Sequence, residues 1–406
     1  MPRVHRADWV LPIDAPPIRN GWIEVANGRI VALGSDSSPG SGEPQAAGRR
    51  RVAILPGLVN AHTHLELSWM KGRVPPGEAM PSWAAKLIRE RVSEEGNPSG
   101  TVDRRAAIVD AIGEAYTSGT VLVGDVTNSL EAYRPLSESR LSASVFYELL
   151  GFRAPDPAGL VETAQQQLMA LPQVDRLRST VVPHAPYSVS PSLFRAIAAA
   201  ADSRPVSVHL GESPEELRFL RDGSGPWREL LEQIGAWTAD WGPPACGPVE
   251  YMRSLGLLHD RLVAVHGAQF TDVDLQLLLD AGATVVTCPR SNRWTGAGAP
   301  PAGRFYASGV RVAIGTDSLA SVEDLNMFSE MAEVRRLAPD AEPGRILRSA
   351  TLEGAAALGF GSELGSIAPG KRAELLAVEI PAGIEDVEEY LVGGIQPDDV
   401  EWLNAD

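Results

Sequence analysis

The sequence predicts an α/β protein: a (β/α)8 TIM-like barrel with a small β-domain formed by both chain termini. Two observations predict the barrel, because apolar, mostly valine-rich runs recur through the middle of the chain and segments with helical spacing separate them. Short strand-like runs at both ends predict the β-domain. Of the 406 residues 44% are hydrophobic, which is enough for a large core.

The two ends of the chain hold the runs expected to form the β-domain. Trp22–Val25 and Arg29–Ala32 flank Asn27-Gly28, which is a strong hairpin signal. Residues 35–48 are rich in serine, glycine and proline and read as an exposed loop. Near the other end, Ala373–Ile380 is strand-like. Because chain termini often lie close together, we expect these segments to pair.

Eight apolar runs supply the barrel strands, and near-continuous apolar sequence is what a parallel sheet buried on both faces requires. In chain order the runs are Leu58–His64, Val121–Val126, Ala143–Leu149, Thr180–His184, Val206–Leu210, Leu262–His266, Thr284–Cys288 and Val310–Gly315. Helical spacing between them occurs in Ala106–Ala115, Pro191–Ala200, Glu215–Leu231 and Asp272–Asp280. The predicted division of the chain is residues 1–55 and 366–406 for the β-domain and 56–365 for the barrel.

Charge and cysteine content exclude several classes of function. The chain has 36 basic and 52 acidic residues, a net charge of −16, so it would repel a nucleic-acid polymer but not a small nucleoside. Two cysteines cannot form a disulfide framework, which points to the reducing cytoplasm. The sequence lacks a continuous apolar run of about 18 residues, so no membrane span is expected. A homodimer is compatible with this composition.

Histidines gather where the predicted barrel strands end, which is where barrel active sites lie. His62 and His64 close the first run, and residues i and i+2 of a strand point to the same side, so both imidazoles can bind one metal. Later strands are followed by His184, His209, His266 and Asp317. Each one alone is more often a core histidine or a turn acid. Independent core residues would not gather at one end of successive strands, so together they predict a metal site.

Six ordered motifs extend over most of the chain. They are LPGLVNAHTH (55–64), VPHAPYSVS (182–190), VHLGE (208–212), VHG (265–267), TCPRSN (287–292) and IGTDS (314–318). A seventh segment, LGSIAPGKRAE, occupies 364–374. Together these motifs resemble the amidohydrolase superfamily, and most of all its deaminases of adenosine-type compounds such as S-adenosylhomocysteine.

The resemblance implies a role for the residues of these motifs. The implied roles are binding of one divalent metal for His62, His64, His209 and Asp317, proton handling for Glu212, His266 and Asp317, and nucleoside contact for His184. Three imidazoles and a carboxylate suit Zn²⁺ or Fe²⁺ and leave a position open for water. Many relatives hold two metals bridged by a carbamylated lysine. No lysine lies on a predicted barrel strand, so we expect a single metal.

Two glutamates near the motifs have alternative interpretations. Glu212 lies three residues after His209, so the loop can fold it back beside the water, where it can donate a proton to a ring nitrogen. Its alternative role is that of an ordinary acid at a helix N-terminus. Glu66 is acidic where the resemblance leads us to expect an apolar or small residue. It either touches the substrate or forms hydrogen bonds within its loop, and we favour the loop.

The outer part of the substrate has weaker candidates. Trp83 follows the first strand and can cover an aromatic ring, although a buried structural tryptophan is equally consistent with the sequence. Arg153 follows the third strand, and its guanidinium matches the geometry of a carboxylate. Arg290 and Arg293 are competing choices.

The resemblance implies hydrolytic deamination of an adenine-containing nucleoside with release of ammonia. The signature His62-Thr-His-Leu-Glu-Leu-Ser68 is similar to 6-aminodeoxyfutalosine deaminases of menaquinone biosynthesis, so this compound is the first candidate substrate. A deaminase of S-adenosylhomocysteine or methylthioadenosine is the alternative, followed by guanine deaminase and triazine-type chlorohydrolase, since fold alone does not decide activity. A metal-free binding protein is a further class, which the presence of every expected ligand disfavours.

Overall fold

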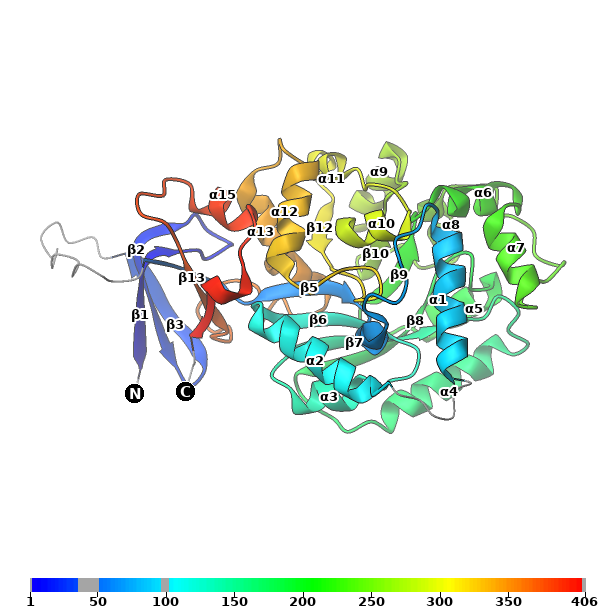
Figure 1. The fold of residues 1–406 in the computed structure, drawn as a ribbon, viewed down its shortest axis with the longest axis horizontal. Helices are drawn as coiled ribbons and strands as arrows, with labels where there is room; N and C mark the ends of the chain where they lie inside the picture. The colour runs from blue at the N-terminus through cyan, green and yellow to red at the C-terminus, as the bar shows by residue number, and fades with distance from the viewer. Residues whose placement is uncertain (1, 36–50, 96–101, 404–406) are drawn as a thin grey trace, which may run out of the picture.

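Strands from both ends of the chain form one six-stranded sheet (Figure 1). This computed structural model describes residues 2–35, 51–95 and 102–403, so nearly all of the loop expected at 35–48 lies outside the described residues. The strands of the sheet are β1 (Arg3–Val10), β2 (Ile18–Ala26), β3 (Arg29–Ser35), β4 (Val52–Pro56), β13 (Leu375–Glu379) and β14 (Val400–Leu403). Their order across the sheet is β14-β13-β4-β1-β2-β3. The predicted hairpin and the predicted pairing of both ends are confirmed.

Eight parallel strands form the barrel, as two four-stranded sheets with the orders β5-β6-β7-β8 and β12-β11-β10-β9. The strands are β5 (Leu58–Thr63), β6 (Thr120–Thr127), β7 (Ser142–Leu149), β8 (Leu177–Pro183), β9 (Val206–Leu210), β10 (Leu262–His266), β11 (Thr284–Thr287) and β12 (Arg311–Ile314). Backbone hydrogen bonds connect the two sheets, from His209 N to His184 O and from Asp317 N to His62 O, both 2.9 Å. All eight predicted runs are strands, which confirms the barrel.

Most helices surround the barrel on its outside, and the last one lies beside the terminal sheet (Figure 1). They are α1 (Met80–Glu95), α2 (Arg104–Thr117), α3 (Tyr133–Glu138), α4 (Pro157–Met169), α5 (Pro191–Ala200), α6 (Pro214–Asp222), α7 (Pro226–Gln233), α8 (Pro248–Ser254), α9 (Asp272–Ala281), α10 (Pro289–Thr295), α11 (Ala302–Ser308), α12 (Met327–Leu337), α13 (Pro343–Ser349), α14 (Leu352–Ala357) and α15 (Val387–Val392), with 3₁₀ turns η1 (Leu65–Met70) and η2 (Pro397–Asp399). The single helix predicted over 215–231 is wrong. Gly223 ends α6 with a left-handed φ of 70°, and Pro226 begins α7.

Close packing of the barrel strands sets the geometry on which the strand ends depend. Every residue of β6 is buried, as the apolar run predicts. At Gly124 of β6 a Cβ atom would lie 2.4 Å from the carbonyl oxygen of Ala61, so only glycine allows β5 this close. Both cysteines, Cys246 and Cys288, are free. Within the described ranges, no helix has the length and apolar character needed to cross a membrane.

Candidate active site

The barrel strands bring the predicted histidines to one point at their C-terminal ends. The ring of His62, on β5, lies 4.9 Å from that of His64 and 4.8 Å from that of His209, centroid to centroid. One ligand atom from each of His62, His209 and His266 lies within 4.8 Å of the others, and the same holds for His62, His64 and Asp317. The strand-end histidines are therefore neighbours in space.

This donor set fits a divalent metal. Both ring nitrogens of His62 are buried without a hydrogen-bond partner among the described residues. An unsatisfied buried polar group costs about 1–3 kcal/mol, which a ligand at the ring would offset. Burial lowers the pKa of His62 and of His64, which keeps these imidazoles in the neutral form that binds metals. The residues that would hold the metal are His62, His64, His209 and Asp317.

Asp317 follows β12 and its carboxylate is held in place from two sides. The hydroxyl of Ser291 donates to Oδ2 at 2.6 Å, and the backbone N–H of Ser318 donates to Oδ1 at 2.7 Å. Burial alone would raise the pKa of Asp317, but His64 and His266 outweigh it and lower that pKa, so the carboxylate is ionised. Its φ of 64° is left-handed, as is the φ of 77° at His266. Such backbone strain in non-glycine residues is typical of functional sites.

The loop after β9 folds Glu212 back over the histidines. Gly211 has a left-handed φ of 60°, which lets the chain reverse there. Glu212 is buried, with Oε1 3.4 Å from His266 Nε2, and the Tyr187 hydroxyl donates to its Oε2 at 3.4 Å. Burial raises the pKa of Glu212 to about 8, so this carboxyl carries a proton at neutral pH. It is thus prepared to act as an acid.

Glu216, rather than Glu212, fills the role of the acid at the start of α6. Its carboxylate accepts the backbone N–H of Gly211 at 2.8 Å and that of Glu212 at 2.9 Å. Ser213 caps the helix by accepting from the backbone of Glu216. Glu216 therefore fixes the backbone that carries Glu212 and leaves the Glu212 side chain to the site.

Glu148, near the end of β7, belongs to the site and is absent from the residues singled out in the sequence. Its Oε1 lies 3.3 Å from His209 Nε2, and Asn128 Nδ2 donates to its Oε2 at 3.0 Å. Burial opposes ionisation of Glu148, but His184 and His209 keep its pKa well below the ordinary value. Burial likewise lowers the pKa of His209, but Glu148 outweighs it and raises that pKa to about 9, so a metal that binds His209 displaces a proton from its ring. An acid inside an apolar run was the available signal.

Glu66 forms hydrogen bonds to nearby loop residues, which is the interpretation favoured from the sequence. Its carboxylate accepts hydrogen bonds from the Thr127 hydroxyl at 2.7 Å and from the backbone N–H groups of Asn128 and Ser129, both at 3.0 Å. These donors form the end of β6 and the turn after it. Glu66 therefore positions Asn128, which in turn holds Glu148.

A model of the amidohydrolase family matches residues 53–397 of the chain. The chain belongs to the amidohydrolase family. An aminodeoxyfutalosine deaminase of Deinococcus radiodurans is 33% identical over 356 residues, covering 84% of this amidohydrolase and 81% of that protein. A 5-methylthioadenosine/S-adenosylhomocysteine deaminase of Nitratidesulfovibrio vulgaris is 28% identical over 386 residues, with 90% and 80% covered. A zinc-bound adenosine deaminase of Xanthomonas campestris superposes with a TM-score of 0.78 at 28% identity, covering 98% of this chain and 90% of that one.

These likenesses confirm the branch that the sequence motifs indicate: the amidohydrolase is an aminohydrolase of the adenosine-type deaminase branch. Three of its histidines, His64, His184 and His209, line the floor of a cavity of about 1030 Å³, a volume that includes solvent at the open mouth. His184 lines this cavity, with its Nδ1 2.5 Å from the Ser188 hydroxyl. Trp83 of α1 is buried and lines the cavity as well.

The arginines considered for the substrate lie elsewhere in the amidohydrolase. Arg153 is exposed and is not among the cavity's lining residues. Arg290 and Arg293 are also outside the lining, and each pairs with a glutamate of α12. Among the described residues that line the cavity, Arg91 of α1 is the one arginine, and no lysine is present. Helical spacing from Trp83 to Arg91, eight residues apart, was the signal that could have found it.

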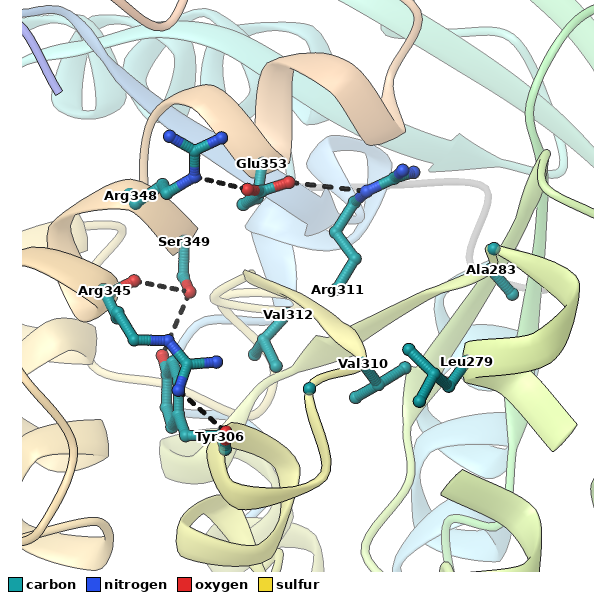
Figure 2. Close-up of a pocket in the computed structure, with 12 residues that line it drawn as sticks. Leu279, Ala283, Tyr306, Val310, Arg311, Val312, Arg345, Arg348, Ser349 and Glu353 are labelled. Atoms are coloured by element: carbon teal, nitrogen blue, oxygen red, sulfur yellow. Dashed lines mark hydrogen bonds and ion pairs between the residues drawn. The ribbon is translucent and has the colours of Figure 1, made fainter. Parts of the chain in front are cut away.

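A second cavity lies at the opposite end of the barrel, near the start of β12 (Figure 2). Arg311 and Arg348 both contact Glu353, and Arg345 donates to the carbonyl oxygen of Tyr306 at 2.8 Å. Its lining residues include no histidine. The chemistry of the amidohydrolase is therefore assigned to the cavity above the histidines.

Proposed function

We propose that this protein deaminates 6-aminodeoxyfutalosine, as in the futalosine route to menaquinone, and releases ammonia. The observation that carries the reaction is the position of Glu212, a buried and protonated carboxyl 3.4 Å from His266 beside the metal-binding residues. The substrate assignment is supported by the Deinococcus radiodurans relative and by the His62–Ser68 signature.

The protonation state of each of the three catalytic residues suits the role that we propose for it in the reaction. A bound metal would supply an activated water. The ionised Asp317 accepts one proton of the attacking water, and neutral His266, whose pKa burial lowers to about 3, orients that water. Glu212 protonates the purine ring nitrogen next to the carbon under attack.

Collapse of the resulting tetrahedral carbon completes the exchange of groups. The C–O bond has formed and the C–N bond to the exocyclic nitrogen breaks. The proton held by Asp317 goes to the leaving nitrogen, which departs as ammonia, and the hydroxyl proton of the carbon returns to Glu212. The product is the 6-oxo purine, with one water consumed.

Deamination of methylthioadenosine or S-adenosylhomocysteine is the second candidate function. The Nitratidesulfovibrio vulgaris relative supports it, and so do apolar cavity residues such as Leu87 and Leu231, which suit a thioether as well as an aryl group.

An ammonia-release assay over a panel of nucleosides tests the proposal. We expect kcat/KM for 6-aminodeoxyfutalosine to exceed that for adenosine by about 10- to 150-fold, the range for a hydrogen bond to a charged group. Methylthioadenosine, S-adenosylhomocysteine and guanine complete the panel, and the Glu212→Gln variant is the control for contaminating deaminases. Equal kcat/KM values for 6-aminodeoxyfutalosine and adenosine, or a clear preference for S-adenosylhomocysteine, would reject 6-aminodeoxyfutalosine as the substrate while leaving the deaminase activity in place.

A further inference from the structure

We propose that the mouth of the active-site cavity is a subsite for an aromatic or apolar group that ends in an anion, and that Arg91 selects for the anion. The inference rests on the proposed function, because it concerns the 5′ substituent of the same nucleoside. To the proposed function it adds a residue that determines substrate specificity and the orientation of the substrate in the cavity.

Two neighbouring helices supply the walls of the mouth. On α1, Trp83, Leu87 and Arg91 are four residues apart, so they lie on one side of the helix, and all three line the cavity. The lining residues from α7 are Trp227, Leu230 and Leu231, and Ile234, which caps the C-terminus of the helix, lines the cavity as well. The two helices contact each other beside the barrel (Figure 1). The mouth is therefore a largely apolar slot between two rigid elements.

Solvent-exposed apolar side chains concentrate at this slot. Ile88, Leu150 and Ile234 line the cavity and are 36%, 50% and 54% exposed. Apolar side chains that converge on a cavity while exposed to water are typical of a ligand site. In addition, the ring of Trp83 lines the cavity. These features fit an aryl group better than a bare ribose.

The charges along the cavity give the substrate a direction. The floor carries three carboxyl groups, from Glu148, Glu212 and Asp317, whereas the mouth carries the guanidinium of Arg91. Arg91 is partly buried and has no ion pair or hydrogen bond with another described residue. An anionic end of the substituent would be attracted to Arg91, and the amino-bearing ring has to reach Glu212 and the metal-binding residues at the floor, so the ring enters first.

A pair of matched substrates isolates the contribution of Arg91. Both are adenine nucleosides with the same 5′ aryl substituent, which ends in a carboxylate in one and in a neutral carboxamide in the other. Arg91→Gln should lower kcat/KM for the carboxylate by about 10- to 150-fold, mostly through KM, and leave the carboxamide unchanged. Arg89→Gln is the matched control, since Arg89 is exposed on the same helix and does not line the cavity.

The apolar walls are tested separately with Ile234→Ser, a substitution at a side chain too exposed to disturb folding. It should lower kcat/KM for both aryl nucleosides and leave 5′-deoxyadenosine unchanged, because that compound does not reach the mouth. An equal effect of Arg91→Gln on both aryl nucleosides, or no effect of Ile234→Ser, overturns the inference alone. Wild-type enzyme that releases ammonia from neither aryl nucleoside overturns the proposed substrate together with the inference.

Discussion

His62 and Glu212 are both buried in the candidate active site, yet their surroundings prepare them for opposite tasks. His62 has two unpartnered ring nitrogens and a pKa lowered by burial, so it accepts a cation. Glu212 has partners in His266 and Tyr187, and burial raises its pKa to about 8, so it holds a proton. At the scale of single residues, burial therefore separates metal binding from proton transfer.

Loss of one imidazole should remove the metal. We expect purified protein to hold about one divalent metal per chain, and His64→Ala to lose most of it, because three donors bind far more weakly than four. Elemental analysis by mass spectrometry measures the ratio. Two metals per chain would contradict the single-metal prediction, which rests on the absence of lysine from the strands.

Glu212→Gln should keep the metal and lower kcat by about 10²-fold or more, the range for loss of a general acid–base group. The amide keeps the shape of the side chain but has no proton to donate. Glu229→Gln, an exposed glutamate of α7, is the control and should keep full turnover. If Glu212→Gln also keeps it, another group delivers the proton.

Glu148→Gln should weaken metal retention by about 10- to 100-fold, because outer carboxylates that contact a ligating imidazole tune its affinity by that amount. The 3.3 Å contact from Glu148 Oε1 to His209 Nε2 is the reason for the expectation. Competition with a chelator measures the affinity. Unchanged retention together with a raised KM would instead make Glu148 a substrate contact.

At the scale of elements, the approach of β12 to β5 holds the ligands in register. A Cβ atom at Gly315 would lie 2.8 Å from Cβ, N and O of His62, so the space between these strands admits only glycine. Gly315 is not among the residues with positive φ, so crowding alone explains the glycine.

Gly315→Ala should therefore lower the free energy of unfolding by about 1–3 kcal/mol, the usual effect of overpacking, and reduce metal content by displacing His62. Thermal unfolding and elemental analysis measure the two effects. Gly113→Ala is the control, because nothing lies within 4 Å of a Cβ there on α2, and it should be neutral or stabilising by about 0.5–1 kcal/mol. Equal melting temperatures for the two variants would show that the space between Gly315 and His62 tolerates a methyl group.

The strands were more predictable from sequence than the helices or the full site, for physical reasons. Burial on both faces requires continuous apolar runs, so strands such as β6 are visible in the sequence. The break between α6 and α7 depends on a left-handed Gly223, which helical spacing does not report. The role of Glu148 could not be predicted from the sequence because it depends on contact with His209, about sixty residues away. Arg153 was a candidate because it follows a strand in the sequence, but it does not line the cavity.

At the scale of the whole molecule, the terminal sheet is anchored to the barrel through its last strand. Trp402 of β14 stacks on Tyr116 of α2 with 4.7 Å between ring centroids, and its Nε1 donates to the carbonyl oxygen of Tyr116 at 2.8 Å. The site lies at the other end of the barrel strands. Stability and catalysis should therefore respond differently to changes here.

Trp402→Ala should lower the free energy of unfolding by up to about 3 kcal/mol, below the range for a fully buried tryptophan because Trp402 is only partly buried. Turnover per folded, metal-loaded molecule should not change. Denaturant unfolding and kcat of the purified variant test both halves of this expectation. A fall in kcat at full metal occupancy would mean that the sheet influences the site.

The terminal sheet pairs strands that are far apart in the sequence, and this has a consequence during synthesis of the chain. β4 is complete at Pro56, but β13, its neighbour in the sheet, begins at Leu375, roughly 320 residues later. At about 5–20 residues per second, a ribosome needs on the order of 16–64 s to make that stretch. Throughout this interval one edge of an apolar strand has no partner, and such an edge can pair with other chains. The nascent protein is thus exposed to misassociation until β13 has been made.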